Sequence, residues 1–475
     1  MSFQKANLVL YVKCAFIFLI LIPYEIFSQG ISNLWLTGYA CGSRPECGVS
    51  ATNLFSGFAD TIHSNISMSF METNANISDS LGNLLFYTNG VYIANSLNDT
   101  MLNGAGLNPA PYTSQNSNYG LRVKQGNLIL PMPGNQSKYY LFHETMYLDS
   151  TINDYRPLEL FYSIIDMSLD SNRGKVIQKN NLLFPDTLTI GSITGCKNAN
   201  GRDWWIVFHK ATGQRYYEFL LTPNGLQGPF IQDIGYSIQA RDWSWQSCFS
   251  PDGSKYATVY RKDTFDLMDF DRCSGLFSNC ISTEINDSGF TRGIAFSPDS
   301  KKLYVTSSNY IYQYSAMSTS LDSSKVLVST FDKFAEPIPP FYVGYYLAQL
   351  GNDGKIYVNS KSATRWMTVI NNPDSIGLAC NVLDHGFLLP TINGFTLPNF
   401  PNYFLEKKAG TICDSLPLIM NHSDIFRVRN KLNISKPKAT SPKTLIKNNP
   451  LDNPLDEKSS YQYFLIKTSE LLLNK

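Results

Sequence analysis

The stretch "GIAFSPDSKKLYVTSSNYIYQYSA", residues 293–316, predicts a strand, a four-residue turn and two further strands. Pro298 presets φ at the second position of the turn, and the Asp299 side chain can bond to nearby backbone. Ser300 takes the place that glycine has in related turns, which predicts a type I turn. The stretch therefore indicates a unit of antiparallel sheet.

The same arrangement recurs in "CFSPDGSKYATVY" (residues 248–260) and "AQLGNDGKIYVNS" (residues 348–360), where Gly253 and Gly354 can accept a positive φ. The turn aspartates, at positions 252, 299 and 353, lie 47 and 54 residues apart. Weaker copies place a Gly/Asn turn before a strand of branched and aromatic residues, and they span residues 77–88, 123–131 and 196–209. Such spacing indicates equivalent structural units.

A recurrence of about 45–55 residues, with short strands and no amphipathic helix period, is typical of a β-propeller. Residues 30–408 divide into seven units of about 54 residues, of which six can be recognised. We expect the seventh in the 73-residue gap before Asn200, or as a sheet closed by strands from both ends. A pair of β-sandwiches is the competing fold, but its strands are not equivalent and need not repeat one turn. The predicted class is all-β, a seven-bladed propeller with a short C-terminal β-type tail.

The composition allows a large folded body. Of 475 residues, 43% are hydrophobic and 13% aromatic, which is enough to bury an extensive core. Charged residues make up 16% and the net charge is +1. Because no basic surface dominates the sequence, we expect no nucleic-acid partner.

Residues 1–28 have the features of a secretory signal peptide. Lys5 and Lys13 form a positive region, the apolar run "CAFIFLILIPYEIF" follows, and Ser28 precedes a predicted cleavage at Gln29. A membrane anchor is the alternative, but the uninterrupted apolar run is shorter than the about 20 residues that span a bilayer. We expect export through the periplasm, a secreted or outer-membrane surface location, and no transmembrane segment after cleavage.

Nine cysteines are present, and eight remain after removal of residues 1–28. An even number in an exported chain favours disulfides. Two pairs are close in sequence, Cys41 with Cys47 and Cys273 with Cys280, so a short loop can bring each pair within bonding distance. Zinc is the rival use, but no CxxC pair occurs and we predict no metal site. The other four cysteines can pair in three ways: Cys196, Cys248, Cys380 and Cys413.

No residue is assigned a catalytic role, and no cofactor is predicted. The five histidines have no metal-ligand or acid–base spacing; His209 is expected to bond to backbone, and His385 is the candidate for a place near the axis. The carboxylates of "DLMDFDRCSG" (residues 266–275) lack the spacing of a calcium loop, so a strand and a turn stapled by Cys273 and Cys280 are the better interpretation. Motifs for serine hydrolases and nucleotide binding are missing from the sequence.

Two tryptophan pairs stand out. Trp204 and Trp205 are adjacent on a predicted strand, so they face opposite sides and only one is expected in the core. Trp243 and Trp245 are two residues apart, so their side chains share a face of a strand. Together they can stack on sugar rings, with the charged residues Arg241 and Asp242 next to them. The alternative is that these rings fill the space between blades. The candidate ligand-binding residues are Trp243, Trp245, Arg241 and Asp242.

Several segments together resemble a family of large secreted propeller proteins from bacteria of the Bacteroidota group. In order they are "ISDSLGNLLFYTNGVYIAN", "MLNGAGL", "YSIIDMSLD", "DLMDFDRCSG", "FSPDSKKLYVTSSNYIYQY", "LGNDGKIYV", "INNPDSIGLACN" and "LPNFPNY". The resemblance covers residues 69–403 and implies a WD-repeat-like or lactonase-like propeller exported by type IX secretion. It implies no established activity.

The C-terminal residues are consistent with that export route. Residues 409–446 contain a Pro/Lys/Ser-rich linker without an apolar period. Residues 447–475 resemble the opening of a type IX sorting domain, with "SELLLN" in place of a family turn and the later strands missing. We predict a partial or degenerate sorting domain, with the type IX secretion machinery as partner, and a disordered basic tail is the alternative.

The predicted domains are a signal peptide (1–28), a propeller (29–408), a linker (409–446) and the partial sorting domain (447–475). The predicted function is a secreted or cell-surface binding module for a protein or glycan, in preference to an enzyme. The alternatives are a hydrolase or lyase at the central channel and a purely structural surface component. Converging carboxylates in a channel pocket favour the enzyme, whereas an aromatic patch without them favours binding.

Overall fold

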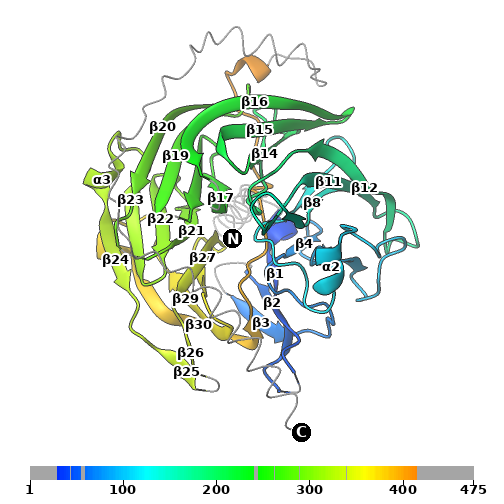
Figure 1. Cartoon of the computed structure of the whole chain (residues 1–475), viewed down its shortest axis with the longest axis horizontal. Helices are drawn as coiled ribbons and strands as arrows, with labels where there is room; N and C mark the ends of the chain where they lie inside the picture. The colour runs from blue at the N-terminus through cyan, green and yellow to red at the C-terminus, as the bar shows by residue number, and fades with distance from the viewer. Residues whose placement is uncertain are drawn as a thin grey trace, which may run out of the picture. The chain divides into compact units, whose positions relative to one another are not determined.

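A computed structural model describes residues 29–42, 44–54, 59–239, 244–261, 263–287, 289–337 and 340–414. These residues form mainly short antiparallel sheets, seven of which are arranged around one axis (Figure 1). The fold is a seven-bladed β-propeller, which confirms the predicted all-β class and blade number; the predicted C-terminal β-type tail lies outside the described residues. No helix in this part of the chain is long and apolar enough to cross a membrane.

The first two blades have three strands each. Blade 1 contains β1 (Leu34–Tyr39), β2 (Gly48–Asn53) and β3 (Asp60–His63). Blade 2 contains β4 (Ala75–Ser78), β5 (Leu84–Thr88) and β6 (Ile93–Asn95). Short helices are η1 (Gln29–Ser32), α2 (Pro111–Gln115), α3 (Leu321–Ser324), η2 (Gly377–Cys380) and η3 (Ile412–Asp414).

The other five blades have four strands each. Blade 3 contains β7 (Asn127–Pro131), β8 (Lys138–Glu144), β11 (Glu159–Asp166) and β12 (Lys175–Pro185); blade 4 contains β13 (Thr194–Lys197), β14 (Trp204–His209), β15 (Gly213–Thr222) and β16 (Gly225–Ile238). Blade 5 contains β17 (Ser244–Phe249), β18 (Lys255–Tyr260), β19 (Thr264–Asp271) and β20 (Leu276–Glu284). Blade 6 contains β21 (Thr291–Phe296), β22 (Lys302–Ser307), β23 (Tyr310–Ser315) and β24 (Val326–Thr330); blade 7 contains β27 (Tyr345–Leu350), β28 (Ile356–Ser360), β29 (Thr364–Ile370) and β30 (Val382–Asn393). Two extra hairpins are β9 (Tyr147–Asp149) with β10 (Asp154–Arg156), and β25 (Ala335–Pro337) with β26 (Pro340–Tyr342).

The ring closes by packing between neighbouring blades. The first strand of each blade lies nearest the axis (Figure 1), and β17 contacts β21, which contacts β27. At the junction of the chain's two ends, β30 packs against all three strands of blade 1. Each blade is therefore covered on both faces, which completes a core that no single sheet could build.

The seventh blade is not where we expected it. The six recognised repeats belong to blades 2–7, and the unrecognised one is blade 1 at the start of the ring. The long gap before Asn200 is instead filled by blade 3, whose strands β8 and β11 are separated by the β9–β10 hairpin. The copy at residues 123–131 was also misaligned, because its turn precedes β7 and links two blades.

The repeated turns have the predicted geometry at glycine. Gly253 and Gly354 adopt φ values of 69° and 79°. Ser300 adopts nearly the same conformation, with φ of 62°, so the serine occupies the left-handed region as the glycines do. Local bonds hold it there, since the Ser300 N–H donates to the Ser297 carbonyl at 2.9 Å.

Both adjacent tryptophans are buried, so the prediction that only one joins the core is wrong. Trp204 packs edge-on against Tyr403, at 5.8 Å between ring centroids. Trp205 packs edge-on against Phe230 at the same distance, and its indole N–H donates to the Arg272 carbonyl at 2.8 Å. Opposite faces of β14 are both interior because a neighbouring blade covers each of them.

One predicted disulfide is confirmed and one is wrong. Cys41 and Cys47 are bonded, with Cα atoms 5.1 Å apart. Cys273 bonds to Cys413 and not to Cys280. The register explains this, because Ile281 pairs with Leu267 in the hairpin, which places Cys280 far along the strand from Cys273 in the turn. The described free thiols are Cys196, Cys248, Cys280 and Cys380.

Residues 394–404, here called the axial segment, follow β30 and bond to inner strands of several blades. The Thr396 hydroxyl donates to the Glu72 carbonyl of blade 2 at 2.6 Å. Further along, the Tyr403 hydroxyl donates to the Ile129 carbonyl of blade 3 at 2.8 Å. Beyond it, the Lys408 N–H donates to the Ala199 carbonyl at 2.8 Å. The chain thus remains attached to the propeller up to the disulfide at Cys413.

We expect two buried histidines to destabilise the propeller on acidification. Burial lowers the pKa of His143 to about 3 and that of His209 to about 4, so the unfolded chain binds protons that the folded chain does not. Stability is fully present above pH 6.5 and is lost as the pH falls toward these values. Burial raises the pKa of Asp266 to about 6 and raises that of Glu144 well above its ordinary value, so these two carboxyls oppose the effect of the histidines. At about 1.4 kcal/mol per pH unit and group, the two histidines by themselves contribute a loss of about 4 kcal/mol from pH 7 to 5.

Urea unfolding at pH 7 and pH 5 measures this loss. His143→Gln removes one of the two responsible groups and is expected to show a shallower pH dependence than the wild type. Asp266→Asn removes one of the opposing groups and is expected to show a steeper one. Equal slopes for all three proteins would contradict the assignment.

Candidate functional site

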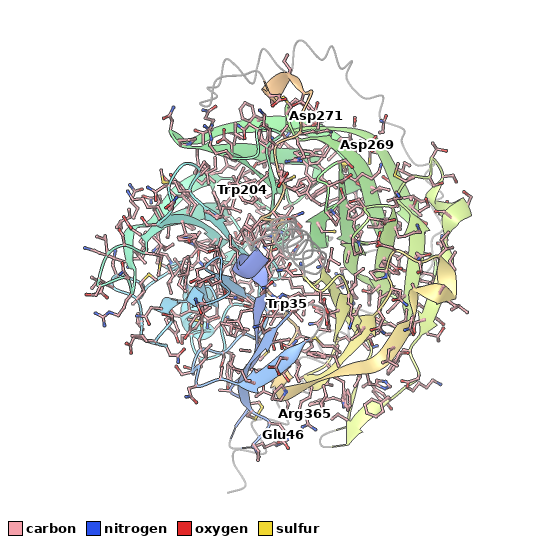
Figure 2. All side chains as sticks on the ribbon, turned by 180° about the vertical axis from the view of Figure 1, so that it is seen from behind. Trp35, Glu46, Trp204, Asp269, Asp271 and Arg365 are labelled. Carbon is pink, nitrogen blue, oxygen red and sulfur yellow. A yellow bond between two sulfur atoms is a disulfide. The ribbon has the colours of Figure 1, made fainter. Side chains whose placement is uncertain are left out.

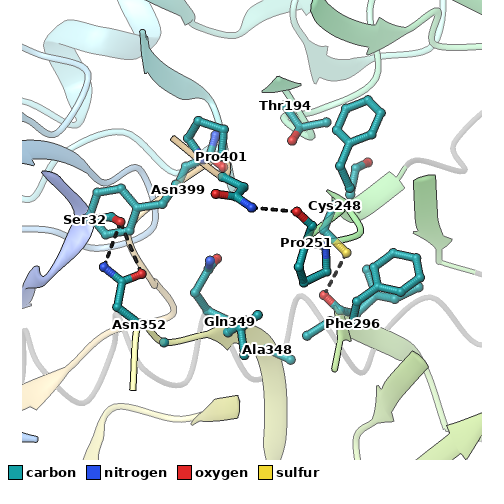
Figure 3. Close-up of a pocket in the computed structure, with 18 of the residues that line it drawn as sticks. Ser32, Thr194, Cys248, Pro251, Phe296, Ala348, Gln349, Asn352, Asn399 and Pro401 are labelled. Carbon is teal, nitrogen blue, oxygen red and sulfur yellow. Dashed lines mark hydrogen bonds between the residues drawn. The ribbon is translucent and has the colours of Figure 1, made fainter. Parts of the chain in front are cut away.

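A cavity of about 280 Å³ lies beside the axial segment and is here called the axial cavity (Figure 3). Its wall includes the last residues of three inner strands: Phe249 of β17, Phe296 of β21 and Leu350 of β27. The turns that follow these strands contribute Pro251, Pro298 and Gly354. The repeated turns of the sequence thus surround the cavity, and the axial segment supplies residues 399–402 and Phe404.

Five side-chain amides line the axial cavity: Gln125, Gln349, Asn352, Asn399 and Asn402. Among them, Asn402 Nδ2 donates to the Pro251 carbonyl at 2.6 Å. Asn352 Nδ2 donates to Ser32 Oγ at 3.1 Å (Figure 3). In the described part of the chain, the Gln349 side chain makes no hydrogen bond. Its amide is therefore available to a ligand in the cavity.

Other amides complete the inner edges of the blades. Inner strands diverge at the axis, so the backbone groups on their free edges lack a neighbouring strand. Gln246 replaces that neighbour: its Oε1 accepts from the Ile294 and Ala348 N–H groups at 3.1 and 3.0 Å, and its Nε2 donates to the Ala348 carbonyl at 2.6 Å. Asn399 Nδ2 likewise donates to the carbonyls of Asn127 and Ile193, at 2.9 and 2.8 Å. These bonds tie blades 3 to 7 together around the axial segment.

The lining of the axial cavity is poor in ionisable groups. None of the described lining residues is Asp, Glu, His, Lys or Arg, and Cys248 is the single titratable side chain among them. Burial raises the pKa of the Cys248 thiol to about 12, and its Sγ donates to the Ile294 carbonyl at 3.5 Å (Figure 3). The thiol stays protonated near neutral pH and is a poor nucleophile. The described lining thus supplies no general acid or base for hydrolysis.

Aromatic rings form the apolar part of the wall. Trp35 lies near the axis (Figure 2), with its ring centroid 5.5 Å from that of Tyr357 and 6.5 Å from that of Phe400. Phe249, Phe296 and Phe404 also line the cavity. Amides and hydroxyls beside aromatic rings suit an uncharged ligand that has both hydroxyl groups and an apolar face.

The tryptophan site predicted from the sequence stays a prediction. Arg241, Asp242 and Trp243 lie outside the described residues, and β17 begins at Ser244 just after them. Trp245 is the second residue of β17, and its side chain is also outside the description.

The two histidines singled out from the sequence have different outcomes. His209 bonds to backbone as predicted, with its Nδ1 2.5 Å from the Lys210 carbonyl oxygen. His385 does not lie near the axis: it is in β30, the outermost strand of blade 7, and packs against Phe334 at 4.1 Å between centroids. β30 is 12 residues long and is the strand of blade 7 farthest from the inner strand β27, so His385 lies at the outer rim of the propeller.

The carboxylates of residues 266–275 serve the structure of blade 5. Asp269 forms an ion pair with Lys255 at 2.7 Å, and Asp271 Oδ1 accepts from the Cys273 N–H at 2.7 Å. Both lie away from the axis (Figure 2), beside a second cavity of about 800 Å³ between blades 5 and 6. Among the described residues, no group of three or more His, Cys, Asp or Glu is placed to hold a metal ion.

The axial cavity was not predicted. Its polar residues come from η1, from blades 3, 4, 5 and 7 and from the axial segment, which are far apart in sequence. Two signals were available: the polar residue Gln125, two positions before the inner strand β7, and the amides within "LPNFPNY". The turn sequences themselves contribute mainly backbone and proline to the wall.

Fold and site together define the class, a seven-bladed β-propeller with a segment of its own chain along the axis. No protein-family model and no curated protein matches the sequence. Among solved structures, it is similar to a functionally unknown protein from Desulfotomaculum acetoxidans, at 10% identity and TM-score 0.41 over 78% of this chain and 100% of the other. It is also similar to the periplasmic gluconolactonase of Pseudomonas aeruginosa, at 9% identity and TM-score 0.41 over 78% and 100%. Likenesses of this size transfer no activity to this chain.

Proposed function

We propose that this protein is an extracytoplasmic binding module whose axial cavity takes an uncharged polar ligand of the carbohydrate class. The observation that carries the proposal is the described lining of the cavity, which combines five amides with aromatic rings and offers no carboxylate or histidine. Such a lining can recognise sugar hydroxyls and stack on a sugar ring, but it lacks the groups that glycoside hydrolysis requires. A volume of about 280 Å³ suits a ligand of one or two rings.

The disulfides support the extracytoplasmic part of the proposal. Cys41–Cys47 and Cys273–Cys413 are both formed, and such bonds persist in oxidising compartments. The signal peptide lies outside the residues that the structure describes. It is proposed from the sequence alone, as are type IX export and a cell-surface location. Residues 415–475, which hold most of the linker and the partial sorting domain, are likewise outside it.

A glycan and peptidoglycan array on the full-length chain tests the proposal. For a carbohydrate that binds, Gln349→Ala is expected to raise Kd about tenfold, since one ligand hydrogen bond contributes about 1.5 kcal/mol. Calorimetric titration measures the change. Gln178→Ala on β12 is the matched control, because Gln178 is an exposed glutamine of blade 3 and does not line the cavity; its Kd should equal that of the wild type.

Two results would count against the axial cavity. If no carbohydrate binds above background, the ligand class is wrong. If binding is lost in Trp243→Ala/Trp245→Ala but unchanged in Gln349→Ala, the ligand binds at the tryptophan pair predicted from the sequence and not in the cavity.

A further inference from the structure

The inner strands point backbone groups at the axis at every second residue. In an antiparallel ladder, the N–H and C=O of one residue bond to the neighbouring strand, and those of the next residue point away from it. Just after β17, the Ser250 N–H donates to the Lys255 carbonyl of β18, at 2.9 Å. Ser247 and Phe249 therefore direct their N–H and C=O groups toward the axis. The same alternation holds in β13, β21 and β27, after which the corresponding bonds join Asn198 to Asp203, Ser297 to Lys302 and Gly351 to Lys355.

One layer of these axis-facing groups is paired within the protein. Gln125 binds both groups of Ser247: its Oε1 accepts from the N–H at 2.9 Å, and its Nε2 donates to the C=O at 3.0 Å. Gln246 binds both groups of Ala348 in the same way. Side-chain amides are thus the groups that complete the inner edges of this propeller. The members of this layer, each with a side-chain amide as partner, are Ile193, Ser247, Ile294 and Ala348.

The next layer, two residues closer to the turns, lines the axial cavity. It lies about 7 Å further along each strand and consists of Gly195, Phe249, Phe296 and Leu350. At Phe296, the backbone is hydrogen-bonded to the Cys248 thiol. In the part of the chain that the structure describes, no side chain bonds to the axis-facing groups of Gly195, Phe249 or Leu350. Because interior backbone groups normally have partners, these groups are open to water or a ligand.

Two polar side chains add to the open backbone groups. The Gln349 amide makes no hydrogen bond within the described residues, and the same is true of the Thr194 hydroxyl, although Thr194 is only 4% exposed. Thr194 is in β13 and Gln349 in β27, three blades further around the ring, and Figure 3 shows them on opposite sides of the cavity. A buried hydroxyl usually has a partner, so this one is also available to a ligand.

We infer that the axial cavity recognises an acetamido group, so that its ligand is an N-acetylated sugar; this inference rests on the proposed function. An acetamido group has its N–H and C=O on opposite edges, so it can join the inner edges of two blades, as Gln246 Oε1 joins β21 and β27. Its methyl group suits the aromatic part of the wall. A free amino sugar does not suit the cavity, because the described lining has no carboxylate to pair with an ammonium group.

Calorimetric titration of the full-length chain with three disaccharides tests the inference. N,N′-diacetylchitobiose and cellobiose differ only in having acetamido or hydroxyl groups at the second carbon of each ring, and chitobiose has amines there. The diacetylated sugar is expected to bind at least about tenfold more tightly than cellobiose, because a hydroxyl is too short to join two blades and leaves a backbone group without a partner. Chitobiose is expected to bind most weakly of the three.

Amide hydrogen exchange locates the contact without the use of a variant. Saturation with N,N′-diacetylchitobiose should slow exchange of the Phe249 and Leu350 N–H groups by about tenfold, since each gains access to a hydrogen-bond acceptor in the ligand. The Ser247 and Ala348 N–H groups are matched controls in the same strands. Their exchange should not change, because side-chain amides already bind them.

Three results would overturn the inference in distinguishable ways. Equal binding of N,N′-diacetylchitobiose and cellobiose, both weakened in Gln349→Ala, would leave the proposed function intact and show that the cavity does not select an acetamido group. A preference for the diacetylated sugar with unchanged exchange at Phe249 and Leu350 would place the acetamido contact outside the cavity. Binding of the uncharged peptide N-acetyl-trialanine amide in place of any sugar, or no binding of a sugar, would contradict the proposed function itself.

Discussion

Replacing both Cys273 and Cys413 by alanine is expected to lower the free energy of unfolding by about 5 kcal/mol. The bridge joins residues 140 apart in sequence, and closing a loop of that length removes a large part of the unfolded chain's entropy. The Arg272 guanidinium, which donates to the Glu406 carbonyl at 2.6 Å, also holds this region. Urea unfolding of the oxidised protein measures the loss.

Two controls separate this bridge from the alternative pairing. Cys280→Ala removes a free thiol and should change stability by no more than about 1 kcal/mol. Alanine at both Cys41 and Cys47 opens a loop with a sequence separation of 6, for which the entropy model gives about 2 kcal/mol. If Cys280→Ala were as destabilising as the double variant, the pairing of Cys273 with Cys280 would be correct and the long bridge would not.

Asn399→Ala is expected to cost about 4 kcal/mol. The substitution removes the donor to two buried carbonyls, those of Asn127 and Ile193, and an unsatisfied buried group costs about 1–3 kcal/mol. The Asn399 Oδ1 also accepts from Gln125 Nε2 at 3.3 Å, so a link to blade 3 is lost as well. Thermal and urea unfolding report the effect.

Asn402→Ala is the matched control, because Asn402 is an asparagine of the same segment whose two side-chain bonds are only partly buried: its Nδ2 donates to the Pro251 carbonyl, and its Oδ1 accepts from the Phe404 N–H at 2.9 Å. Its expected cost is about 2 kcal/mol. Asn399→Asp keeps the shape but sets a carboxylate against two carbonyls, and it should be more harmful than alanine. A cost for Asn399→Ala no larger than that for Asn402→Ala would show that the axial segment does not hold the blades together.

The blades that could be recognised from the sequence are those whose turns contain characteristic glycine, proline or asparagine residues. Gly253, Gly354 and the prolines of the turns are local signals, because each residue acts on its own backbone. Blade 1 lacks such a turn: its first two strands are joined by residues 40–47, which the Cys41–Cys47 bond closes. It therefore escaped recognition although its three strands pair as regularly as those of blade 2.

The candidate site was beyond local reasoning. Gln125 meets Ser247 at the axis, with its Nε2 3.0 Å from the Ser247 carbonyl oxygen, although the two are 122 residues apart. Gln246 of blade 5 likewise meets Ala348 of blade 7. The local sequence around one residue does not indicate these contacts, because the order in which the blades pack around the axis determines which residues come together.

What the sequence by itself determined is the repeating unit: turn residues, strand length and spacing are short-range properties, and together they led to a seven-bladed propeller. The stretch around Ser300 was sufficient for that. Only the tertiary structure decided which faces are interior, which cysteines meet and what lies at the axis. Burial of both Trp204 and Trp205 follows from neighbours on either side of a blade, and the Cys273–Cys413 bond follows from the path of the axial segment. These outcomes depend on closing the ring, which brings together residues that no local pattern relates.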